Sequence, residues 1–299
     1  MPVDYPHRSP AFLQLRVAVR PFVSPEPVTI GLSGGADSLA LVAAALVEGQ
    51  AVHAVVVDHQ LQAGSVGVAK QAAMQARAWG ADATVIPVTV SQEGSMEAAA
   101  RAARYEALIA CGRPVWTGHT MDDQAETYLL GALRGNPAGM LPHSKYGEAD
   151  IVRPLLSVRR ATTRATCAEL GVTPWEDPHN DSEAFRRVAV RKQVMPLLDA
   201  INGGPAVPGV AQAAYRVALQ HDFVQQAARA TTSIAELASM HPAVRHASIA
   251  GLIRDADCPI KYATVVAVEQ LVTQWHGQGP VAIGGGRSIR RHGSELRVD

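Results

Sequence analysis

The chain has 299 residues, with 27 basic and 27 acidic side chains and a formal net charge of zero. A neutral total excludes binding to polyanions by overall charge, so any nucleic-acid surface has to be local. Three widely separated cysteines exclude a disulfide framework and the C-x-x-C spacing of a zinc or iron–sulfur site. The length accommodates one large α/β domain and a smaller second one.

The ends and apolar runs of the chain carry no membrane signal. The N-terminus, MPVDYPHRSPAF, lacks the apolar core of a secretory signal. The longest aliphatic run, 39–47, is well short of the ~20 residues that span a bilayer. We therefore expect a soluble cytoplasmic protein with no membrane partner.

Strand-like and helix-like segments alternate through the first 135 residues. The expected strands are 28–32, 52–58, 83–88 and 115–118. The expected helices between them are 38–48, 66–80, 95–111 and 122–133. Continuous apolar strands are typical of a parallel sheet that is buried on both faces. The alternation predicts an α/β fold with a doubly wound parallel sheet, whose ligands bind beyond the carboxyl ends of the strands.

The rest of the chain is less regular. Residues 136–150 are expected to form a turn-rich insertion, and 153–199 helices at both ends of a turn at 174–181. Pro196 is expected to mark the end of the last helix. A Gly- and Pro-rich stretch at 201–209 predicts a linker between domains at 1–200 and 209–299. In the second, mostly helical domain, we expect three helices within 210–275, then a β hairpin or three-stranded cap at 280–298.

The first expected strand runs directly into a glycine turn and a helix. Backbone N–H groups at such a turn lack internal partners, and the helix dipole favours an anion there. The residues expected to cradle phosphate are Ser33, Gly34, Gly35, Ala36, Asp37 and Ser38. Neither G-x-x-x-x-G-K-[ST] nor G-x-G-x-x-G occurs, which argues against a Walker loop or a dinucleotide site. The alternative is a strand–helix turn that binds nothing.

A second motif, GHTMDDQAET, places His119, Asp123 and Glu126 three or four residues apart, and therefore on one helical face. Asp122 adds a third carboxylate at the same helix start. Their repulsion calls for a cation, and Mg²⁺ takes carboxylate and phosphate oxygens. The alternative is a set of acids placed at a helix N-terminus for solubility.

Two further features carry weaker signals. Arg101 and Arg104 share a face of an alanine-rich helix, where guanidinium groups could neutralise a pyrophosphate leaving group. The alternative is a surface pair of Arg101 with Glu97. Asp58 and His59 end the second strand, at the edge where adenine or ribose would lie. The alternative for His59 is a strand-end histidine with no ligand.

With these motifs in hand, SGGADS resembles the pyrophosphate loop of the ATP-pyrophosphatase superfamily. VDHQLQ, MEAAARAARYEAL, GHTMDDQAET, RPLL and WEDPHNDSEAFRRVAVRKQVMP follow it in order over residues 28–198. In this order and spacing the motifs resemble the tRNA(Ile)-lysidine synthetase family. The resemblance implies that the first domain is a PP-loop ATP-pyrophosphatase domain, and that the second binds tRNA.

The resemblance also implies a reaction and its partners. ATP, the co-substrate, would adenylate the wobble cytidine of tRNA(Ile) with the CAU anticodon, with Mg²⁺ as cofactor. Free L-lysine would then displace AMP, giving lysidine, AMP and pyrophosphate. The sequence leaves oligomeric state open, a homodimer included.

Carried over residue by residue, the resemblance assigns these roles. SGGADS, Asp58 and His59 would bind ATP, and Asp37 and Asp123 would lie near magnesium. Arg104 and His119 would stabilise the activated phosphate, and Glu126 would orient the lysine. The expected tRNA contacts are Arg153, Arg187 and Arg191. Further local basic residues are Arg159, Arg160, Arg164, Arg186 and Lys192, with Arg287, Arg290, Arg291 and Arg297 near the C-terminus.

Three departures from the family pattern concern how the anticodon loop is held. Gln60-Leu61-Gln62 replaces the usual glycine and arginine, the loop at 136–140 is short, and Ala189 replaces an arginine. Four other functions stay open as alternatives. The first is a tRNA 2-thiolation enzyme, which the scattered cysteines disfavour. The second is an amidotransferase-linked pyrophosphatase, although no glutaminase domain is found. The others are a silent nucleotide- or tRNA-binding module and a hydride-transferring dinucleotide enzyme.

Overall fold

The computed structural model describes residues 3–60, 64–89, 96–177 and 185–299, with the side chains of 96–98 left out. The chain divides into two compact units, Met1–Val217 and Ala218–Asp299. The division falls inside the helix α9 (Val207–Ala227). The domains expected at 1–200 and 209–299 therefore stay a prediction.

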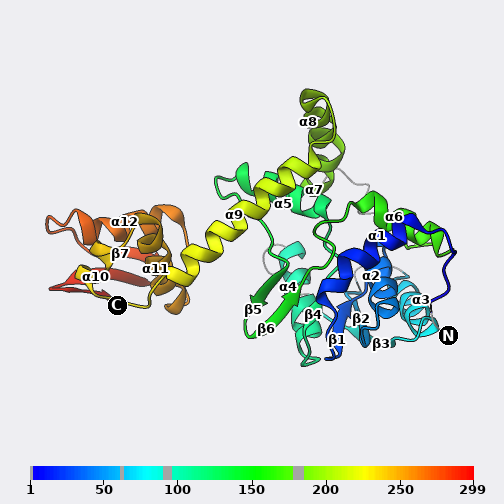
Figure 1. Cartoon of the computed structure of the whole chain (residues 1–299). Helices are drawn as coiled ribbons and strands as arrows, with labels where there is room; N and C mark the ends of the chain where they lie inside the picture. The colour runs from blue at the N-terminus through cyan, green and yellow to red at the C-terminus, as the bar shows by residue number, and fades with distance from the viewer. Residues whose placement is uncertain (1–2, 61–63, 90–95, 178–184) are drawn as a thin grey trace. The chain divides into compact units, whose positions relative to one another are not determined.

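The first unit is built on a six-stranded sheet with the order β3-β2-β1-β4-β6-β5 (Figure 1). Its strands are β1 (Val28–Gly31), β2 (Val52–Asp58), β3 (Asp82–Pro87), β4 (Val115–Trp116), β5 (His143–Tyr146) and β6 (Ala149–Val152). All neighbours are parallel except β5 and β6, so the doubly wound parallel fold is confirmed. The chain winds one way from β1 to β3 and returns to place β4 on the other side of β1. That reversal puts the ligand crevice at the carboxyl ends of β1 and β4.

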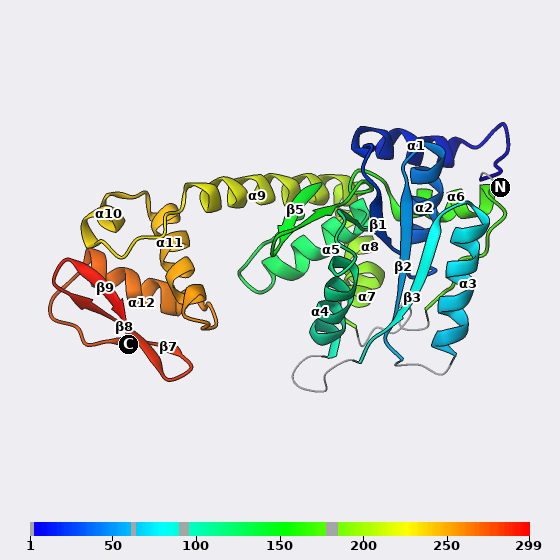
Figure 2. The same cartoon turned by 90° about the horizontal axis from the view of Figure 1, so that it is seen from below.

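Helices cover both faces of this sheet. They are α1 (Pro10–Val19), α2 (Ala36–Val47), α3 (Ser65–Ala78), α4 (Met96–Ile109), α5 (Met121–Ala132) and α6 (Arg160–Glu169). Helices α2 and α3 contact β1, β2 and β3, while α1 and α6 contact α2, and Figure 2 shows α3 running alongside β3. Strand β2 alternates between two cores: Val56 packs with α2, and Val55 packs with Tyr105 and Leu108 of α4. Its buried faces explain why the middle of its sequence, 54–57, is apolar.

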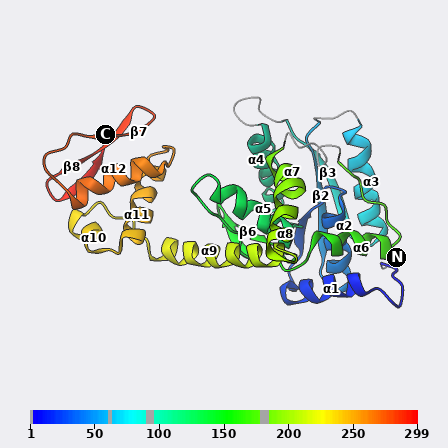
Figure 3. The same cartoon turned by 90° about the horizontal axis from the view of Figure 1, so that it is seen from above.

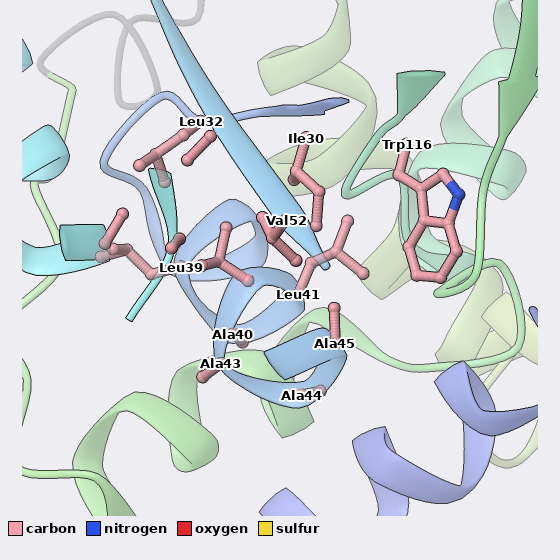
Figure 4. Close-up of a cluster of buried hydrophobic side chains, with 14 of the residues drawn as sticks. Ile30, Leu32, Leu39, Ala40, Leu41, Ala43, Ala44, Ala45, Val52 and Trp116 are labelled. Carbon is pink, nitrogen blue, oxygen red and sulfur yellow. The ribbon is translucent and has the colours of Figure 1, made fainter. Parts of the chain in front are cut away.

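The main core forms where α2 packs on the sheet. Figure 4 shows Ile30, Leu41 and Trp116 close together at this contact, above the alanines of α2 in that view. Ala40, Ala43, Ala44 and Ala45 have no exposed surface, because α1 and α6 cover the helix on its outer side. A helix that is apolar all round is typical of such a buried position. The start of α2 is thereby held rigidly beside β4.

The prediction of a turn-rich insertion at 136–150 is wrong for the second half of that range. Residues from His143 to Val152 form the β5–β6 hairpin, closed by Gly147 at φ 57°. β5 is a polar edge strand, and its sequence lacks the apolar alternation that marks a half-buried strand. β6 joins the sheet because it pairs in parallel with β4.

The expectation for Pro196 is also wrong. α7 (Arg186–Ala189) and a π-helical turn (Val190–Val194) lead into α8 (Met195–Asn202), so Pro196 lies in the first turn of a helix. The helical run continues through this proline because the π-helical turn directly before it changes the backbone hydrogen-bond pattern, with the Met195 N–H donating to the Val190 carbonyl five residues back. α8 ends at Gly203, which is left-handed at φ 66°. The expected linker at 201–209 is therefore a short turn, since α9 begins at Val207.

The second unit carries α10 (Ile234–Ser239), α11 (Pro242–Asp255) and α12 (Tyr262–Thr273), which Figure 3 shows beside its small sheet. With α9, this makes one helix more than the three expected, because Ser233 caps a short helix of its own by accepting a hydrogen bond from the Glu236 N–H. The three-stranded cap is confirmed as β7 (Val281–Gly284), β8 (Arg287–His292) and β9 (Glu295–Val298). Within the described residues, no helix has the length and apolarity to cross a membrane.

Candidate active site

The loop between β1 and α2 is shaped by its own two serines. The Ser38 hydroxyl donates to the Gly35 carbonyl at 3.0 Å and accepts from the Ser33 N–H at 3.1 Å. Gly34 is left-handed at φ 82°, and its carbonyl accepts from the Trp175 N–H at 2.9 Å. Gly35 precedes α2 with no side-chain cap, so the first N–H groups of the helix are left for a ligand.

The end of β4 reaches this loop through Gly118. A Cβ at Gly118 would lie 3.1 Å from the carbonyl carbon and oxygen of Asp37 and 3.2 Å from the Ser38 nitrogen. Only glycine permits two backbones to approach so closely. This contact brings the GHTMDDQAET motif beside SGGADS, as expected where the strand order reverses.

The first turn of α5 presents the predicted carboxylates. Asp123 closes a capping box with Thr120: its Oδ2 accepts from the Thr120 N–H at 2.8 Å and from the Thr120 hydroxyl at 2.7 Å. Asp122 accepts from Arg159 and from the Arg160 N–H at 2.8 Å, and so binds the start of α6. Glu126 is only 2% exposed. These acids are therefore not a solvated helix start.

Arg160 lies among the carboxylates of both motifs. It donates to Asp123 at 2.6 Å and to Glu126 at 2.8 Å, and its Nε is 3.7 Å from Asp37. Arg191, from the π-helical turn, also donates to Glu126, at 2.9 Å. A π-helical turn of this kind is common at functional sites. The PP-loop helix, α5, α6 and the π-helical turn are thus joined by ion pairs.

The pKa of Asp37 is shifted by opposing effects of burial and of its neighbours. Burial raises its pKa to about 6, against a hydrogen bond from the Thr163 hydroxyl, and the nearby Asp123 charge adds to the rise. A carboxyl with a pKa near neutrality would be made fully ionic by a cation or by a guanidinium that moves closer.

His119 follows Gly118 and faces the basic side of the site. Loss of solvent lowers its pKa to about 3, and although Asp123 opposes this, the charges of Arg153, Arg101 and Arg104 add to it. The ring is therefore neutral at pH 7. Its Nδ1 is 2.7 Å from the Thr117 hydroxyl, which can donate to it and leave Nε2 with the proton.

A group of arginines surrounds this side of the site. Arg104 is exposed, yet partial desolvation and then the charges of Arg101 and Arg187 lower its pKa. Arg101 lies 4.9 Å from the ring centre of Tyr105, whose hydroxyl it also contacts at 3.4 Å. No ion pair is recorded for Arg101 or Arg104 within the described part of the chain. Unlike the carboxylate side, this side carries positive charge that no carboxylate of the described residues pairs with, and such charge favours an anion.

At the end of β2, Asp58 is buried and its Oδ1 accepts from the Gln60 N–H at 3.0 Å. Gln60 itself is left-handed, at φ 55°. Desolvation and then the charge of Arg104 lower the pKa of His59, and the His59 Nδ1 is buried without a hydrogen-bond partner. Arg104 of α4 therefore links this end of β2 to the arginine group.

The three arginines expected at tRNA lie in different environments. Arg153 is 8% exposed and donates to the Leu141 carbonyl at 3.0 Å and to the Ser144 hydroxyl at 2.8 Å, which holds the β5–β6 hairpin. Arg187 is half-buried and contacts the Thr127 hydroxyl at 3.4 Å. Arg191 is engaged by Glu126. Their role toward RNA stays a prediction.

Two site residues, Arg160 and Thr163, were not predicted from the sequence as parts of the active site. From the sequence, Arg159 and Arg160 were predicted to be basic residues available to RNA. In the structure both form ion pairs with carboxylates of α5. The signal was present: three acids within five residues need cations, and this arginine pair follows RPLL. Helical spacing cannot show which distant arginine supplies the charge. Part of WEDPHNDSEAF, at 178–184, lies outside the described residues.

The loop that is shorter than the family pattern folds back tightly on α5. The Asn136 N–H donates to the Gly131 carbonyl at 3.0 Å, and a Cβ at Gly131 would fall 2.5 Å from the Asn136 carbonyl oxygen. Gln124 then fixes the chain beyond the loop through two hydrogen bonds to Met140, of 2.8 and 2.7 Å. The short loop is thus an ordered continuation of the site.

Beside the carboxylates lies a cavity of about 220 Å³. It is lined by Asp122, Glu126, Arg159, Arg191, Met195, Pro196, Asp199 and Val207. Both signs of charge and an apolar wall therefore meet in one enclosure. Among the residues that the structure describes, no three His, Cys, Asp or Glu side chains converge as a ready metal site.

The comparisons with known proteins agree with this geometry. The family described as the PP-loop domain matches residues 11–198. The chain is 45% identical to the tRNA(Ile)-lysidine synthase of Corynebacterium glutamicum, covering 99% of this chain and 97% of the relative. It is 50% identical to that of Corynebacterium diphtheriae, covering 98% of each. The fold resembles U34-tRNA thiolase NcsA from Methanococcus maripaludis, with a TM-score of 0.56 and 14% identity over 69% of this chain and 78% of that one.

A parallel sheet, a glycine loop leading into a buried helix, and facing carboxylates define the ATP-utilising PP-loop class of proteins. Within this class the match at 45–50% identity extends over both units and nearly the whole length of each relative. The chain belongs to the tRNA(Ile)-lysidine synthase family.

Proposed function

We propose that this protein ligates L-lysine to C2 of the wobble cytidine of tRNA(Ile) with the CAU anticodon. In the first step the cytidine O2 attacks the α-phosphorus of ATP, and pyrophosphate leaves. In the second, an amino group of lysine attacks C2, the bond from C2 to the oxygen of AMP breaks, and a proton is lost. The single observation that carries this is the division of the site into a carboxylate side beside the loop of residues 33–38 and an arginine side around His119, where no described carboxylate pairs with Arg101 or Arg104.

The arginine side suits the adenylation step. The loop and the start of α2 would hold the phosphates, with Asp58 and His59 toward the nucleoside. Arg104 would neutralise charge on the phosphates as the leaving group departs. Neutral His119 would donate a hydrogen bond from Nε2 and not a charge, since its low pKa excludes the imidazolium at pH 7.

Magnesium fits the donors present. Asp37 and Asp123 face the same guanidinium, and Mg²⁺ is usually held by one or two carboxylates together with substrate phosphates. Asp37 and Asp123 would hold it, and it would polarise the phosphates of ATP when bound. Asp37, whose raised pKa reflects burial, would gain its full charge with that cation nearby.

The 220 Å³ cavity suits free lysine, which carries a carboxylate and two amines on an aliphatic chain. Arg159 would take the carboxylate, and Asp122, Glu126 and Asp199 an ammonium group, while Met195 would lie along the aliphatic chain. Glu126 would orient the lysine, as the family resemblance implies. The same carboxylates could accept the proton that the attacking amine must lose.

The remaining partners are proposed on the same basis. A domain beyond residue 209 would add contacts that distinguish this tRNA from methionine tRNA, because the CAU anticodon is common to both. Arg153, Arg187 and Arg191 are proposed as the tRNA contacts of the first unit. We further propose a cytoplasmic location, where tRNA is modified, and a homodimer as the assembly to be tested.

The deciding experiment supplies ATP, Mg²⁺, labelled lysine and a tRNA(Ile) transcript with the CAU anticodon, with a CCU-anticodon transcript as control. Label in the first RNA alone supports the proposal. Pyrophosphate release that depends on tRNA but without lysine incorporation would refute lysine as the nucleophile. Absence of both would leave a silent binding module. Asp37→Ala and Asp123→Asn should each abolish AMP formation, and near-normal rates would contradict their proposed roles.

A further inference from the structure

A second cavity lies at the amino ends of the strands, on the edge of the sheet opposite the PP-loop. It has a volume of about 380 Å³ and is lined by Arg77, Arg113, His53, Asp82 and Thr84, with short alanines between them. None of these residues belongs to the motifs at the active site. Because parallel strands place His53 at the start of β2 and the PP-loop beyond the end of β1, the two sites are on opposite edges.

The topology brings these side chains together. His53 of β2 is the register partner of Asp82 of β3 and, on its other side, of Thr29 of β1. The Thr29 N–H donates to the Pro114 carbonyl at 2.9 Å, which fixes Arg113 beside the same strand ends. Arg77, in the last turn of α3, donates to the Ala83 carbonyl and is held over the start of β3.

The described lining residues of this cavity balance its positive charges only in part. Within the described residues, neither Arg77 nor Arg113 forms an ion pair, whereas Arg159, Arg160 and Arg191 at the active site all do. Asp82 is the one acidic side chain among the described lining residues. Two guanidinium groups therefore face one carboxylate, leaving one net positive charge.

His53 does not change this balance. Its Nε2 is 2.9 Å from the Thr84 hydroxyl, and its Nδ1 is buried without a partner. Desolvation and then the charge of Arg113 lower its pKa, against the opposing charge of Asp82, so the ring is neutral at pH 7. A neutral ring fixes Thr84 in place, and the arginines supply the charge.

From this arrangement we infer that the cavity is a second anion site, which binds one phosphate group. Guanidinium forks match phosphate oxygens in geometry and charge, and the exposed Thr84 hydroxyl adds a polar partner. One net positive charge suits a single phosphate better than a triphosphate. No Phe, Tyr or Trp side chain lines the cavity among the described residues, so a base would lack a large ring to stack on. The phosphate belongs either to an RNA backbone or to a free phosphate compound.

The test uses the full-length protein with Arg77→Gln and Arg113→Gln combined, and Arg8→Gln as a control for loss of exposed charge. Inorganic phosphate is titrated while the backbone amide signals of Thr84 and Arg113 are followed by NMR. Signals of Gly34 and Gly35 report separately on phosphate at the PP-loop. We expect saturable shifts at Thr84 that weaken about tenfold or more in the double variant and not in the control. Equal urea midpoints for the variants show that folding is intact.

The source of the phosphate is separated by binding of a tRNA transcript at several salt concentrations. If the site takes an RNA phosphate, the slope of log affinity against log salt falls by about one in the double variant. If it takes a free phosphate compound, the slope is unchanged while the Thr84 shifts are lost. Absent Thr84 shifts in the wild-type protein together with an unchanged slope would overturn the inference, as would shifts that survive in the double variant. The outcome does not depend on the lysine ligation.

Discussion

Gly118 at the end of β4 lies directly against the backbone of Asp37, at the start of the PP-loop helix. A Cβ at Gly118 would meet backbone atoms at 3.1–3.2 Å, and backbone cannot rotate away as a side chain can. We expect Gly118→Ala to displace the start of α2, costing about 1–3 kcal/mol of stability. ATP-dependent AMP formation should fall by a larger factor, because the phosphate cradle and Asp37 move together.

Gly67 offers the matched control for that substitution. It lies in the first turns of α3, its φ is not positive, and a Cβ there would meet nothing within 4 Å. Gly67→Ala should keep full activity and leave stability unchanged or raised by up to about 1 kcal/mol. Urea unfolding and AMP formation, measured on both variants, check the pair. Equal activity of Gly118→Ala and Gly67→Ala would contradict the proposed role of the close approach.

Arg160 neutralises the carboxylates that meet at the site. Arg160→Met leaves Asp123 and the buried Glu126 without their shared partner, and breaking such a buried pair typically costs about 3–5 kcal/mol. Urea unfolding measures the loss. Arg164→Gln, which removes an exposed pair with Glu176 on the same helix, should cost about 1 kcal/mol or less. Similar losses for the two variants would mean that Arg160 contributes only as a surface residue.

Arg104 is predicted to act on the phosphates and to contribute little to folding. Its side chain is exposed and within the described residues it forms no ion pair, so Arg104→Gln should leave the urea midpoint nearly unchanged. AMP formation should fall by about 10²–10³, the usual cost of removing a donor from developing charge. Lys70→Gln on the surface of α3 is the control for charge. A large fall in stability together with activity would indicate a structural role instead.

We expect Glu269 to make the stability of the second unit sensitive to acid. Burial opposes its ionisation, but hydrogen bonds from His246 at 2.7 Å and Arg245 at 2.8 Å outweigh burial and hold its pKa below the ordinary 4.5. The folded pKa is thus lower than the unfolded one. Its contribution to stability is therefore full above about pH 4.5 and is lost as pH falls through the folded pKa.

Glu269→Gln tests this contribution. The variant should be less stable than wild type at pH 7, and the difference should shrink below pH 4.5 as the wild-type carboxylate is protonated. Unfolding free energies at several pH values, followed through Trp275 of the same unit, give both slopes. A difference that stays constant from pH 7 to pH 3 would refute the role of this ion pair.

The second unit is predicted to serve tRNA selection and not the chemistry itself. Truncation after Ala227 keeps α9 whole and removes the remaining helices and the small sheet. Lysine incorporation into tRNA(Ile) should weaken, and discrimination against methionine tRNA should relax. The ratio of the two rates, compared with that of the full chain, is the measurement. An unchanged ratio would place the selecting contacts in the first unit.

Much of the first unit follows from the sequence because its signals are local. The strand 28–32, the glycine turn and the apolar helix after it read as one strand–loop–helix unit, and the structure has β1 and α2 there. The β5–β6 hairpin could not be found in this way, since its edge strand is polar and β6 is defined by pairing with a distant strand. The prediction for Pro196 was wrong for a related reason, because a proline also occurs inside a helical run where a π-helical turn precedes it.

The sequence by itself determined the residue types of the site and their order: a phosphate loop, three acids on one helical turn, and two arginines on another. Only the tertiary structure decided which charges face each other. It placed Arg160 among Asp37, Asp123 and Glu126, and left Arg101 and Arg104 without an ion pair within the described residues. It also gathered Arg77 and Arg113 at the opposite edge of the sheet. The physical reason is that helical periodicity acts over a few residues, whereas Coulomb attraction and hydrogen bonding act between neighbours in space, however far apart they are in the chain.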